Sequence, residues 1–241
     1  MGKYALITGA SGGIGSAAAR KLAMEGYSLY LHCYTGEEKL QALIKECREL
    51  GVDAKGIQAD LSSEEGTAGL ISKISDEIEL LVLNSGTGFY GLMTDIKESE
   101  IQKMVYLNVT SPYIITKHLL PSMIRKKAGS IIVISSIWGI TGASCEVLYS
   151  MVKGGQNSFV KALAKETAPS GIRVNAIAPG AVSTNMLASF SAEEKEALIE
   201  EIPLGRLAEP AEIAESIAFL ASKKASYITG QILSVNGGWH C

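Results

Sequence analysis

The sequence predicts one α/β domain in which helices cover both faces of a parallel sheet, and three observations support this fold class. Strand-like runs alternate with helix-like runs along all 241 residues. Several strand-like runs are continuously apolar, as strands covered on both faces usually are. No internal repeat or linker interrupts the alternation. A repeated strand–helix–strand order predicts right-handed crossovers and a single-domain, doubly wound (Rossmann) sheet over residues 1–241.

Apolar runs place the expected strands, and turn residues separate them from the helices. The first strand, "YALIT" at 4–8, precedes a helical period that ends before Gly26. Gly51 ends the second helix in the same way, because glycine tolerates the positive φ of a helix end. Ser62 or Ser63 is expected to cap the third helix through its hydroxyl. The seven expected strands span 4–8, 28–33, 54–58, 80–84, 130–135, 172–177 and 232–235, and the expected helices span 14–25, 37–50, 63–77, 98–106, 108–127, 149–168 and 209–221.

One long stretch, 178–208, shows no clear strand or helix pattern. A loop of this length in a compact domain is usually a lid or a binding loop. We therefore expect it to form a substrate loop. The alternative is a loosely packed helix without a role.

Composition excludes several classes of protein. The net charge is −3, from 22 basic and 25 acidic residues, so no basic surface for nucleic acid is expected. No apolar run reaches the ~18 residues of a membrane span, and the N-terminus does not resemble a signal peptide. The four cysteines form neither a CxxC pair nor a Cys/His cluster, so we expect reduced thiols and no metal site. These features predict a cytoplasmic protein.

The stretch "TGASGGIG" after the first strand predicts a phosphate-binding turn. In a doubly wound sheet this turn lies at a helix N-terminus, where free amide hydrogens and the helix dipole attract phosphate. Gly9, Gly13 and Gly15 allow the backbone to turn and to approach a ligand, and the Ser11 hydroxyl adds a donor. A tight turn that holds no ligand is the alternative.

The spacing of that turn resembles the cofactor loop of the short-chain dehydrogenase/reductase family, and motifs along nearly the whole chain extend the resemblance. They are "LVLNSG" at 81–86, "YLNVTSPY", "VISSIWG", "YSMVK", "APGAVST" and the ending "ITGQILSVNGG". Ser85 stands where the family usually has alanine. The resemblance implies that NAD(P) contacts Gly9, Ser11, Gly13, Ile14, Gly15, Asp60, Leu61, Asn84, Gly86, Tyr149, Lys153, Pro179, Gly180 and Thr184. As a lone aspartate, Asp60 could instead cap the helix that begins near Ser62.

Four residues carry the expected catalysis. Tyr149 and Lys153 are four positions apart and share one helix face, so we expect the ammonium to lower the pKa of the phenol. Ser136, at a strand end, can donate a hydrogen bond to a substrate carbonyl. The resemblance implies that Tyr149 is the acid that protonates the carbonyl oxygen and that Lys153 binds the nicotinamide ribose. It also implies that Ser136 orients the substrate and that Asn108 supports a proton-relay water.

The cofactor is expected to be NADP(H) rather than NAD(H). An acidic residue at the end of the second strand would bind the ribose hydroxyls of NAD, but residues 32–35 contain none. The base that NADP-preferring relatives often carry at Gly12 is also missing. His32 either faces a 2′-phosphate or has a purely structural role.

The substrate is expected to be a ketone. The chain resembles 3-oxoacyl-acyl-carrier-protein reductases, and Arg125–Lys127 resembles half of their carrier-docking patch, although Ser170 replaces the base of the other half. A solvated helix end explains Arg125–Lys127 equally well. Trp138 and Glu146 lie in the segment that lines the pocket in this family. The motifs "SSIWG", "GASCEVLYS" and "NSGTGFYGLMTD" also resemble a subgroup that reduces an aminopentanone on translation elongation factor P. Glu146 could equally be a surface or interface residue.

Two further expectations concern activity and assembly. A cofactor-binding regulator that has lost catalysis is the alternative from another class, although the complete set of four catalytic residues opposes it. The resemblance implies a homotetramer built on the helices at 108–127 and 149–168 and on the C-terminal strand.

Overall fold

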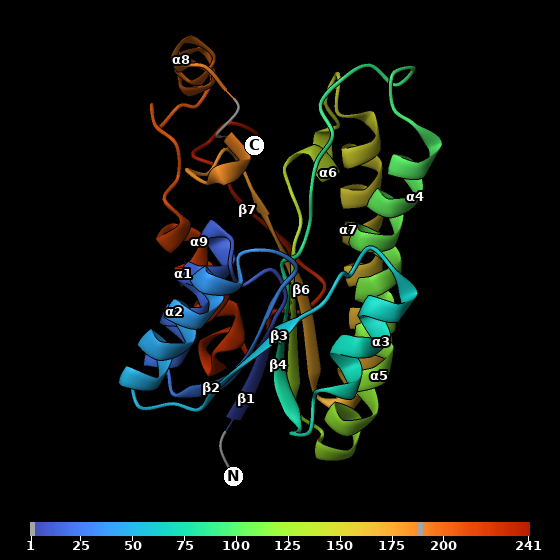
Figure 1. Cartoon of the computed structure of the whole chain (residues 1–241), viewed down its shortest axis with the longest axis vertical. Coiled ribbons are helices and arrows are strands. Elements are labelled where there is room, and N and C mark those ends of the chain that lie inside the picture. The colour runs from blue at the N-terminus through green and yellow to red at the C-terminus, as the bar shows by residue number, and fades with distance from the viewer. Residues whose placement is uncertain (1–2, 188–189) are drawn as a thin grey trace.

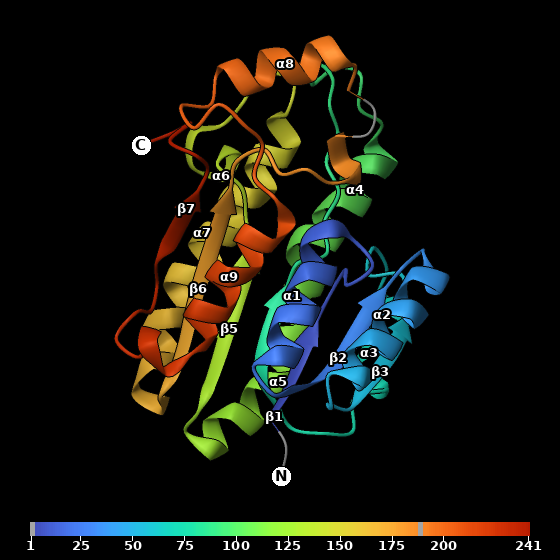
Figure 2. The ribbon, with the colours of Figure 1, turned by 90° about the vertical axis from the view of Figure 1, so that its left-hand side faces the viewer.

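A computed structural model describes residues 3–187 and 190–241, which form a seven-stranded sheet with the strand order β3-β2-β1-β4-β5-β6-β7. Every neighbouring pair of strands is parallel. Figures 1 and 2 show this sheet between two layers of helices. The predicted fold class is confirmed.

The element bounds follow the predicted alternation closely. The strands are β1 Lys3–Ile7, β2 Tyr27–Cys33, β3 Ala54–Gln58, β4 Ile78–Leu83, β5 Gly129–Ile134, β6 Ile172–Pro179 and β7 Ile232–Val235. The helices are α1 Gly13–Met24, α2 Glu37–Glu49, α3 Glu64–Ser72, α4 Glu98–Val105, α5 Ser111–Lys126, α6 Trp138–Thr141, α7 Val147–Thr167, α8 Ala192–Glu200 and α9 Pro210–Ala221, and a π-helix, η1, spans Tyr106–Thr110.

Each face of the sheet has its own apolar core. Helices α1, α2 and α9 cover one face, and α3, α4, α5 and α7 cover the other, as Figure 1 shows. Alternate residues of β1 supply the two cores: Ala5 and Ile7 pack on the first face and Leu6 on the second. This two-sided burial explains why the strands read as continuous apolar runs.

Two predicted elements differ from the structure. The third helix was expected over 63–77 but ends at Ser72, after Ser63 caps its start by accepting the amide hydrogen of Gly66. The stretch 178–208 is not irregular throughout, because it contains the end of β6 and helix α8; its residues 188–189 lie outside the described ones. The Ser191 hydroxyl and the Glu194 carboxylate form a capping box that starts α8. Figure 2 shows α8 lying across the carboxyl end of the sheet.

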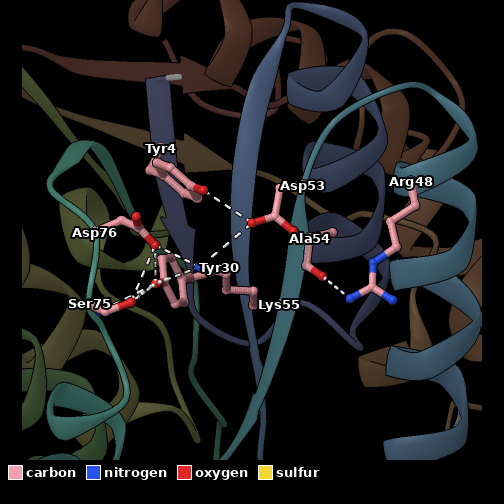
Figure 3. Close-up of polar contacts among 8 residues, drawn as sticks. All are labelled: Tyr4, Tyr30, Arg48, Asp53, Ala54, Lys55, Ser75 and Asp76. Atoms are coloured by element: carbon pink, nitrogen blue, oxygen red, sulfur yellow. Dashed lines mark hydrogen bonds and ion pairs between the residues drawn. The ribbon is translucent and has the colours of Figure 1, made fainter. Parts of the chain in front are cut away.

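A polar network joins β1, β2 and β3 near the opposite end of the sheet (Figure 3). The buried Tyr30 donates its hydroxyl hydrogen to Asp76, and Lys55 forms an ion pair with the same carboxylate at 2.7 Å. The Lys55 ammonium also lies over the rings of Tyr4 and Tyr30, at 5.3 and 5.1 Å from their centroids. The polar groups of Tyr30, Lys55 and Asp76 thus find their partners within the network. The network joins the sheet to the segment before β4.

Within the part of the chain that the structure describes, no helix is both long and apolar enough to cross a membrane. The same residues contain no group of three or more His, Cys, Asp or Glu side chains that could hold a metal ion.

Candidate active site

The candidate site lies at the carboxyl ends of β1 and β4. These strands are neighbours in the sheet, although β2 and β3 separate them along the chain. The chain therefore leaves them toward opposite sides of the sheet, and such a switch point is where doubly wound folds bind ligands. The glycine turn after β1 and the "NSG" segment after β4 meet at this point.

Steric contacts show why the turn after β1 requires glycine. Gly9 has a φ of +67°, in the region that side chains rarely adopt. A Cβ at Gly15 would overlap the carbonyl oxygen of Gly9, and one at Gly13 would lie 2.7 Å from Cγ2 of Thr184. The first turn of α1 also contains Ile14. Because no side chain of the described residues caps α1, the amide hydrogens at its start remain available to an anion.

Thr8 and Asn84 join the two loops at the switch point. The Thr8 hydroxyl accepts the amide hydrogens of Asn84 and Ser85, both at 2.9 Å. The Asn84 side chain donates to the carbonyl oxygens of Thr8 and Gly9, at 3.0 and 3.1 Å. Asn84, expected to contact the cofactor, therefore supports the shape of the glycine turn in this structure.

His32 stabilises the same turn through a hydrogen bond with the backbone of Gly9. Its side chain is buried at 2% exposure, and Nδ1 accepts the amide hydrogen of Gly9 at 3.1 Å. Nε2 lies 3.0 Å from the Ala59 carbonyl oxygen and must donate to it, so the ring is neutral with its hydrogen on Nε2. Burial lowers the pKa of His32, which favours this neutral form. Of the two predicted roles, the structural one is observed.

Three other predicted cofactor contacts make bonds or contacts within the protein. The Asp60 carboxylate accepts the amide and hydroxyl hydrogens of Ser62 at 2.9 and 2.7 Å, as expected of a local turn. The Leu61 side chain is buried in the core beneath α3 and α5. The Ser11 hydroxyl donates to the Thr35 carbonyl oxygen at 3.1 Å, which ties the glycine turn to the loop after β2.

The end of β6 forms the next part of the site. The Pro179 carbonyl oxygen accepts the amide hydrogen of Ile137 at 3.1 Å, and Gly180 donates to Val235 at 3.0 Å. A Cβ at Gly180 would lie 3.0 Å from Asn236. These contacts fix the segment that leads to Thr184, which packs on Gly13 at the start of α1. The structure thus brings the "APGAVST" motif against the glycine turn.

Tyr149 and Lys153 lie on the buried face of α7, and Ser136 follows β5 beside them. The Lys153 Nζ is 5.5 Å from the centroid of the Tyr149 ring and donates to the Ile134 carbonyl oxygen at 2.8 Å. Lys153 is only 3% exposed, and burial lowers its pKa to about 7. The amine therefore titrates near neutral pH.

The expected decrease in the Tyr149 pKa is wrong for this structure. Burial raises the pKa of Tyr149 to about 12, the charge of Glu146 raises it further, and a hydrogen bond with Ser136 opposes the change. The spacing of Tyr149 and Lys153 suggested an effect of charge alone, but desolvation disfavours both the phenolate and the ammonium. Tyr149 consequently keeps its proton at neutral pH, as a group that donates a proton must.

Asn108 lies in the π-helix η1 and is fully buried. In an α-helix its carbonyl oxygen would bond the amide four residues later, but that residue is Pro112, which has no N–H. Nε2 of Gln156 donates to this carbonyl instead, at 2.6 Å. Asn108 was expected to support a relay water. In this structure the partner of its backbone carbonyl oxygen is the Gln156 amide.

The far wall of the site contains both predicted substrate residues. Trp138 begins α6, and its amide hydrogen is donated to the Ser136 hydroxyl at 3.2 Å. Glu146 is half-buried at the start of α7, where burial raises its pKa and a hydrogen bond with Trp138 opposes the increase. The Trp239 ring packs edge-on against Trp138, 5.0 Å between centroids, and donates to Glu201 at 3.1 Å. The sequence pattern did not indicate Trp239, because only the fold brings the C-terminus to this wall.

The residues present fit a nicotinamide dinucleotide. The free amide hydrogens at the start of α1 suit a pyrophosphate. At the other end, Oδ1 of Asn108 is buried without a hydrogen-bond partner among the described residues. A Cβ at Gly86 would lie 3.0 Å from this oxygen and 3.4 Å from the Lys153 Nζ. Glycine thus keeps open the approach to Asn108 and Lys153.

Comparison with known proteins places the chain in a family. Residues 9–240 match a family model described as enoyl-(acyl carrier protein) reductase. The chain belongs to the short-chain dehydrogenase/reductase family and is an NAD(P)-dependent oxidoreductase. The alternative of a regulator without catalysis is not supported.

Individual relatives extend this comparison. The chain is 59% identical over 242 residues to a Bacillus subtilis protein named uncharacterized oxidoreductase YmfI, covering 100% of both chains. It is 39% identical to 3-oxoacyl-[acyl-carrier-protein] reductase FabG of Aquifex aeolicus, covering 99% of this chain and 97% of that one. A short-chain type dehydrogenase/reductase from Mycobacterium marinum superposes with a TM-score of 0.91 at 30% identity, covering 100% of this chain and 96% of the other.

Proposed function

We propose that the protein uses NADPH to reduce a ketone to a secondary alcohol. One observation carries this proposal: Ser136, Tyr149 and Lys153 lie together at the carboxyl edge of the sheet, and Gly86 lies beside Lys153. The relatives named 3-oxoacyl-[acyl-carrier-protein] reductase support the same reaction class.

Each of these residues has a distinct task in the proposed reaction. When bound, the dinucleotide supplies a hydride to the carbonyl carbon. Tyr149, which the high pKa keeps protonated, donates its hydroxyl proton to the carbonyl oxygen as negative charge develops there. Ser136 donates a hydrogen bond to the same oxygen and so orients the ketone. Lys153, whose Nζ lies 5.5 Å from the centroid of the Tyr149 ring, would bind the ribose of the dinucleotide.

We propose NADP(H) rather than NAD(H) as the cofactor. The end of β2 and the residue positions 32–35 contain no carboxylate that would repel a 2′-phosphate. Tyr34 and Thr35 follow β2 beside the glycine turn, to which Ser11 joins them. This preference predicts tighter binding of NADPH than of NADH.

The first candidate substrate is a 3-oxoacyl thioester carried on acyl carrier protein, as the names of the relatives suggest. Arg125–Lys127 do not support docking of that carrier at this site. Lys126 pairs with Glu77 at 2.9 Å and with Glu79 at 3.5 Å, and Arg125 lies 3.7 Å from Glu77. These residues precede β5, whereas Ser136 follows it, so the two groups lie at opposite edges of the sheet.

The second candidate substrate is an aminoketone, such as an aminopentanone on a lysine of elongation factor P. Glu146 favours this substrate, because its carboxylate is half-buried and its charge is close enough to Tyr149 to raise the pKa of that residue. A carboxylate in such a position attracts a substrate ammonium group but offers nothing to a neutral acyl chain.

We expect Glu146→Gln to weaken reduction of an aminoketone selectively. The change removes the negative charge but keeps the size of the side chain, so kcat/KM should fall about tenfold or more for 5-amino-2-pentanone. Turnover of acetoacetyl thioester should change little. NADPH oxidation followed by absorbance measures both rates.

Glu49→Gln, at the exposed end of α2, is the matched control, because it removes the same charge far from the site. Equal effects of Glu146→Gln on the two substrates would remove Glu146 from substrate recognition. Absence of NADPH oxidation with every ketone would contradict the proposed reaction.

We also propose that the protein is a homotetramer that buries parts of α5 and α7. Tyr113 on α5 and Met151 on α7 are each 59% exposed, although both are large and apolar. We expect light scattering to give the mass of four chains and Met151→Glu to reduce it. Met24→Glu, at an exposed site on the other face of the sheet, should leave the mass unchanged. A monomeric wild-type protein would contradict this assembly.

A further inference from the structure

Gln156 bridges two residues of the candidate active site. It lies on α7, three residues after Lys153, and is 4% exposed. Its Oε1 accepts a hydrogen bond from the Lys153 Nζ at 3.1 Å. Its Nε2 donates to the Asn108 backbone carbonyl oxygen at 2.6 Å. One amide group therefore joins the amine on α7 to the π-helix η1.

Both partners of this amide are groups that the local structure leaves available. Pro112 has no N–H to donate to the Asn108 carbonyl in the α-helical pattern, as described above. Lys153 donates on its other side to the Ile134 carbonyl oxygen at 2.8 Å. With Gln156 in place, the amine is held between the end of β5 and the π-helix.

Packing alone does not account for this amide. Other buried positions of the same helix hold the apolar Val152, Val160 and Ala164, and the adjacent Asn157 is a second buried amide, which donates to the Gly139 carbonyl oxygen. An uncharged amide buried at such a position costs free energy unless both of its ends are hydrogen-bonded. An apolar residue of the same length would fill the space without that requirement. The amide is thus suited to its two polar partners.

We infer that Gln156 is a positioning residue, which links the Lys153 amine to the Asn108 carbonyl and supports the charged form of the amine. This inference rests on the proposed function in assigning Lys153 to the reaction, but the contacts themselves do not depend on it. A hydrogen bond to the acceptor Oε1 stabilises the ammonium form of Lys153 more than it stabilises the neutral amine. Gln156 therefore controls both the position and the protonation of Lys153.

The protonation of Lys153 is sensitive to such an acceptor. Because burial lowers the pKa of Lys153 to about 7, the charged and neutral forms are both populated near neutral pH. Removing the acceptor should lower this pKa further, whereas a carboxylate in its place should raise it. Two variants of nearly equal size thus have opposite expected effects.

The test compares Gln156→Met with Gln156→Glu in the full-length protein. The Lys153 side-chain resonance is followed through pH by NMR of protein labelled with [13C]lysine, and its loss in Lys153→Arg assigns it. We expect the Lys153 pKa to fall in Gln156→Met and to rise in Gln156→Glu, each by about one pH unit or more. The limb of the kcat/KM profile at which the Lys153 ammonium loses its proton as pH rises should move in the same direction as this pKa.

Gln41→Met, on the exposed face of α2, is the matched control and should leave the Lys153 titration unchanged. Circular dichroism melting establishes that each variant is folded, and the isosteric Gln156→Glu decides the question if Gln156→Met does not fold. Unchanged titration in the folded variants, or shifts of the same sign, would overturn the inference. If the wild type reduces no ketone, the proposed function fails, while the NMR titration still decides the role of Gln156.

Discussion

Replacing Tyr149 by phenylalanine is expected to lower kcat for ketone reduction by about a thousandfold. The change removes the only proton donor proposed for the carbonyl oxygen, and a positioned general acid contributes roughly 10²–10⁴-fold to a rate. The ring itself remains, so its packing over Lys153 and against Val152 is preserved. Binding of NADPH should therefore change by no more than about threefold. Stopped-flow absorbance measures the rate, and protein fluorescence measures the affinity.

Tyr227→Phe is the matched control for this experiment, because Tyr227 is fully exposed after α9 and the same hydroxyl is lost. It should reduce ketones at the wild-type rate. A Tyr149→Phe protein that keeps most of its activity would show that another group protonates the substrate. Loss of NADPH binding in that variant would indicate instead that the Tyr149 hydroxyl is needed to bind the cofactor.

Gly15→Ala is expected to weaken NADPH binding by about a hundredfold or more. The added Cβ would overlap the Gly9 carbonyl oxygen and would lie 2.8 Å from Nδ2 of Asn84. Gly9 belongs to the glycine turn and Asn84 supports it from the end of β4, so the backbone of the turn must move before the methyl group fits. A displaced turn no longer presents the amide hydrogens at the start of α1 to the pyrophosphate. Isothermal titration with NADPH measures the loss.

Gly69→Ala makes the same chemical change in helix α3, where a Cβ would meet nothing within 4 Å. This control should bind NADPH as the wild type does and should be slightly more stable, because alanine favours a helix. If Gly15→Ala bound NADPH with wild-type affinity, the phosphate site would not be at this turn.

Most of the fold could be predicted from the sequence because burial on both faces leaves continuous apolar runs in the strands. The run "LLVLN" lies within β4 and its end, and "SIIVIS" lies within β5 and its end. Helix α8 was missed because its exposed, charged sequence "AEEKEALIE" has no broad apolar face. Its capping box, Ser191 with Glu194, was the available signal.

The candidate site was predictable where one motif contains the whole geometry. Four-residue spacing places Tyr149 and Lys153 on one helix face, and the glycine pattern predicts the turn after β1. Contacts between distant segments could not be predicted from spacing. The bond between Gly9 and His32 and the bond between Asn108 and Gln156 both depend on how the loops meet in the folded chain.

The pKa of Tyr149 shows a second limit of prediction from sequence. Spacing indicates which charge lies nearby, but it does not show how completely two groups are removed from water. Here burial has the larger effect and raises the pKa of Tyr149 while it lowers that of Lys153. Only the packing of the site could establish this balance.

A crystal structure of the protein with NADP⁺ tests the central claim most directly. We expect the pyrophosphate at the amide hydrogens that begin α1, and the nicotinamide ribose within hydrogen-bonding distance of both the Tyr149 hydroxyl and the Lys153 Nζ. A dinucleotide bound elsewhere, or one whose nicotinamide lies beyond the reach of these two groups, would contradict the assignment of this site as a ketone reductase centre.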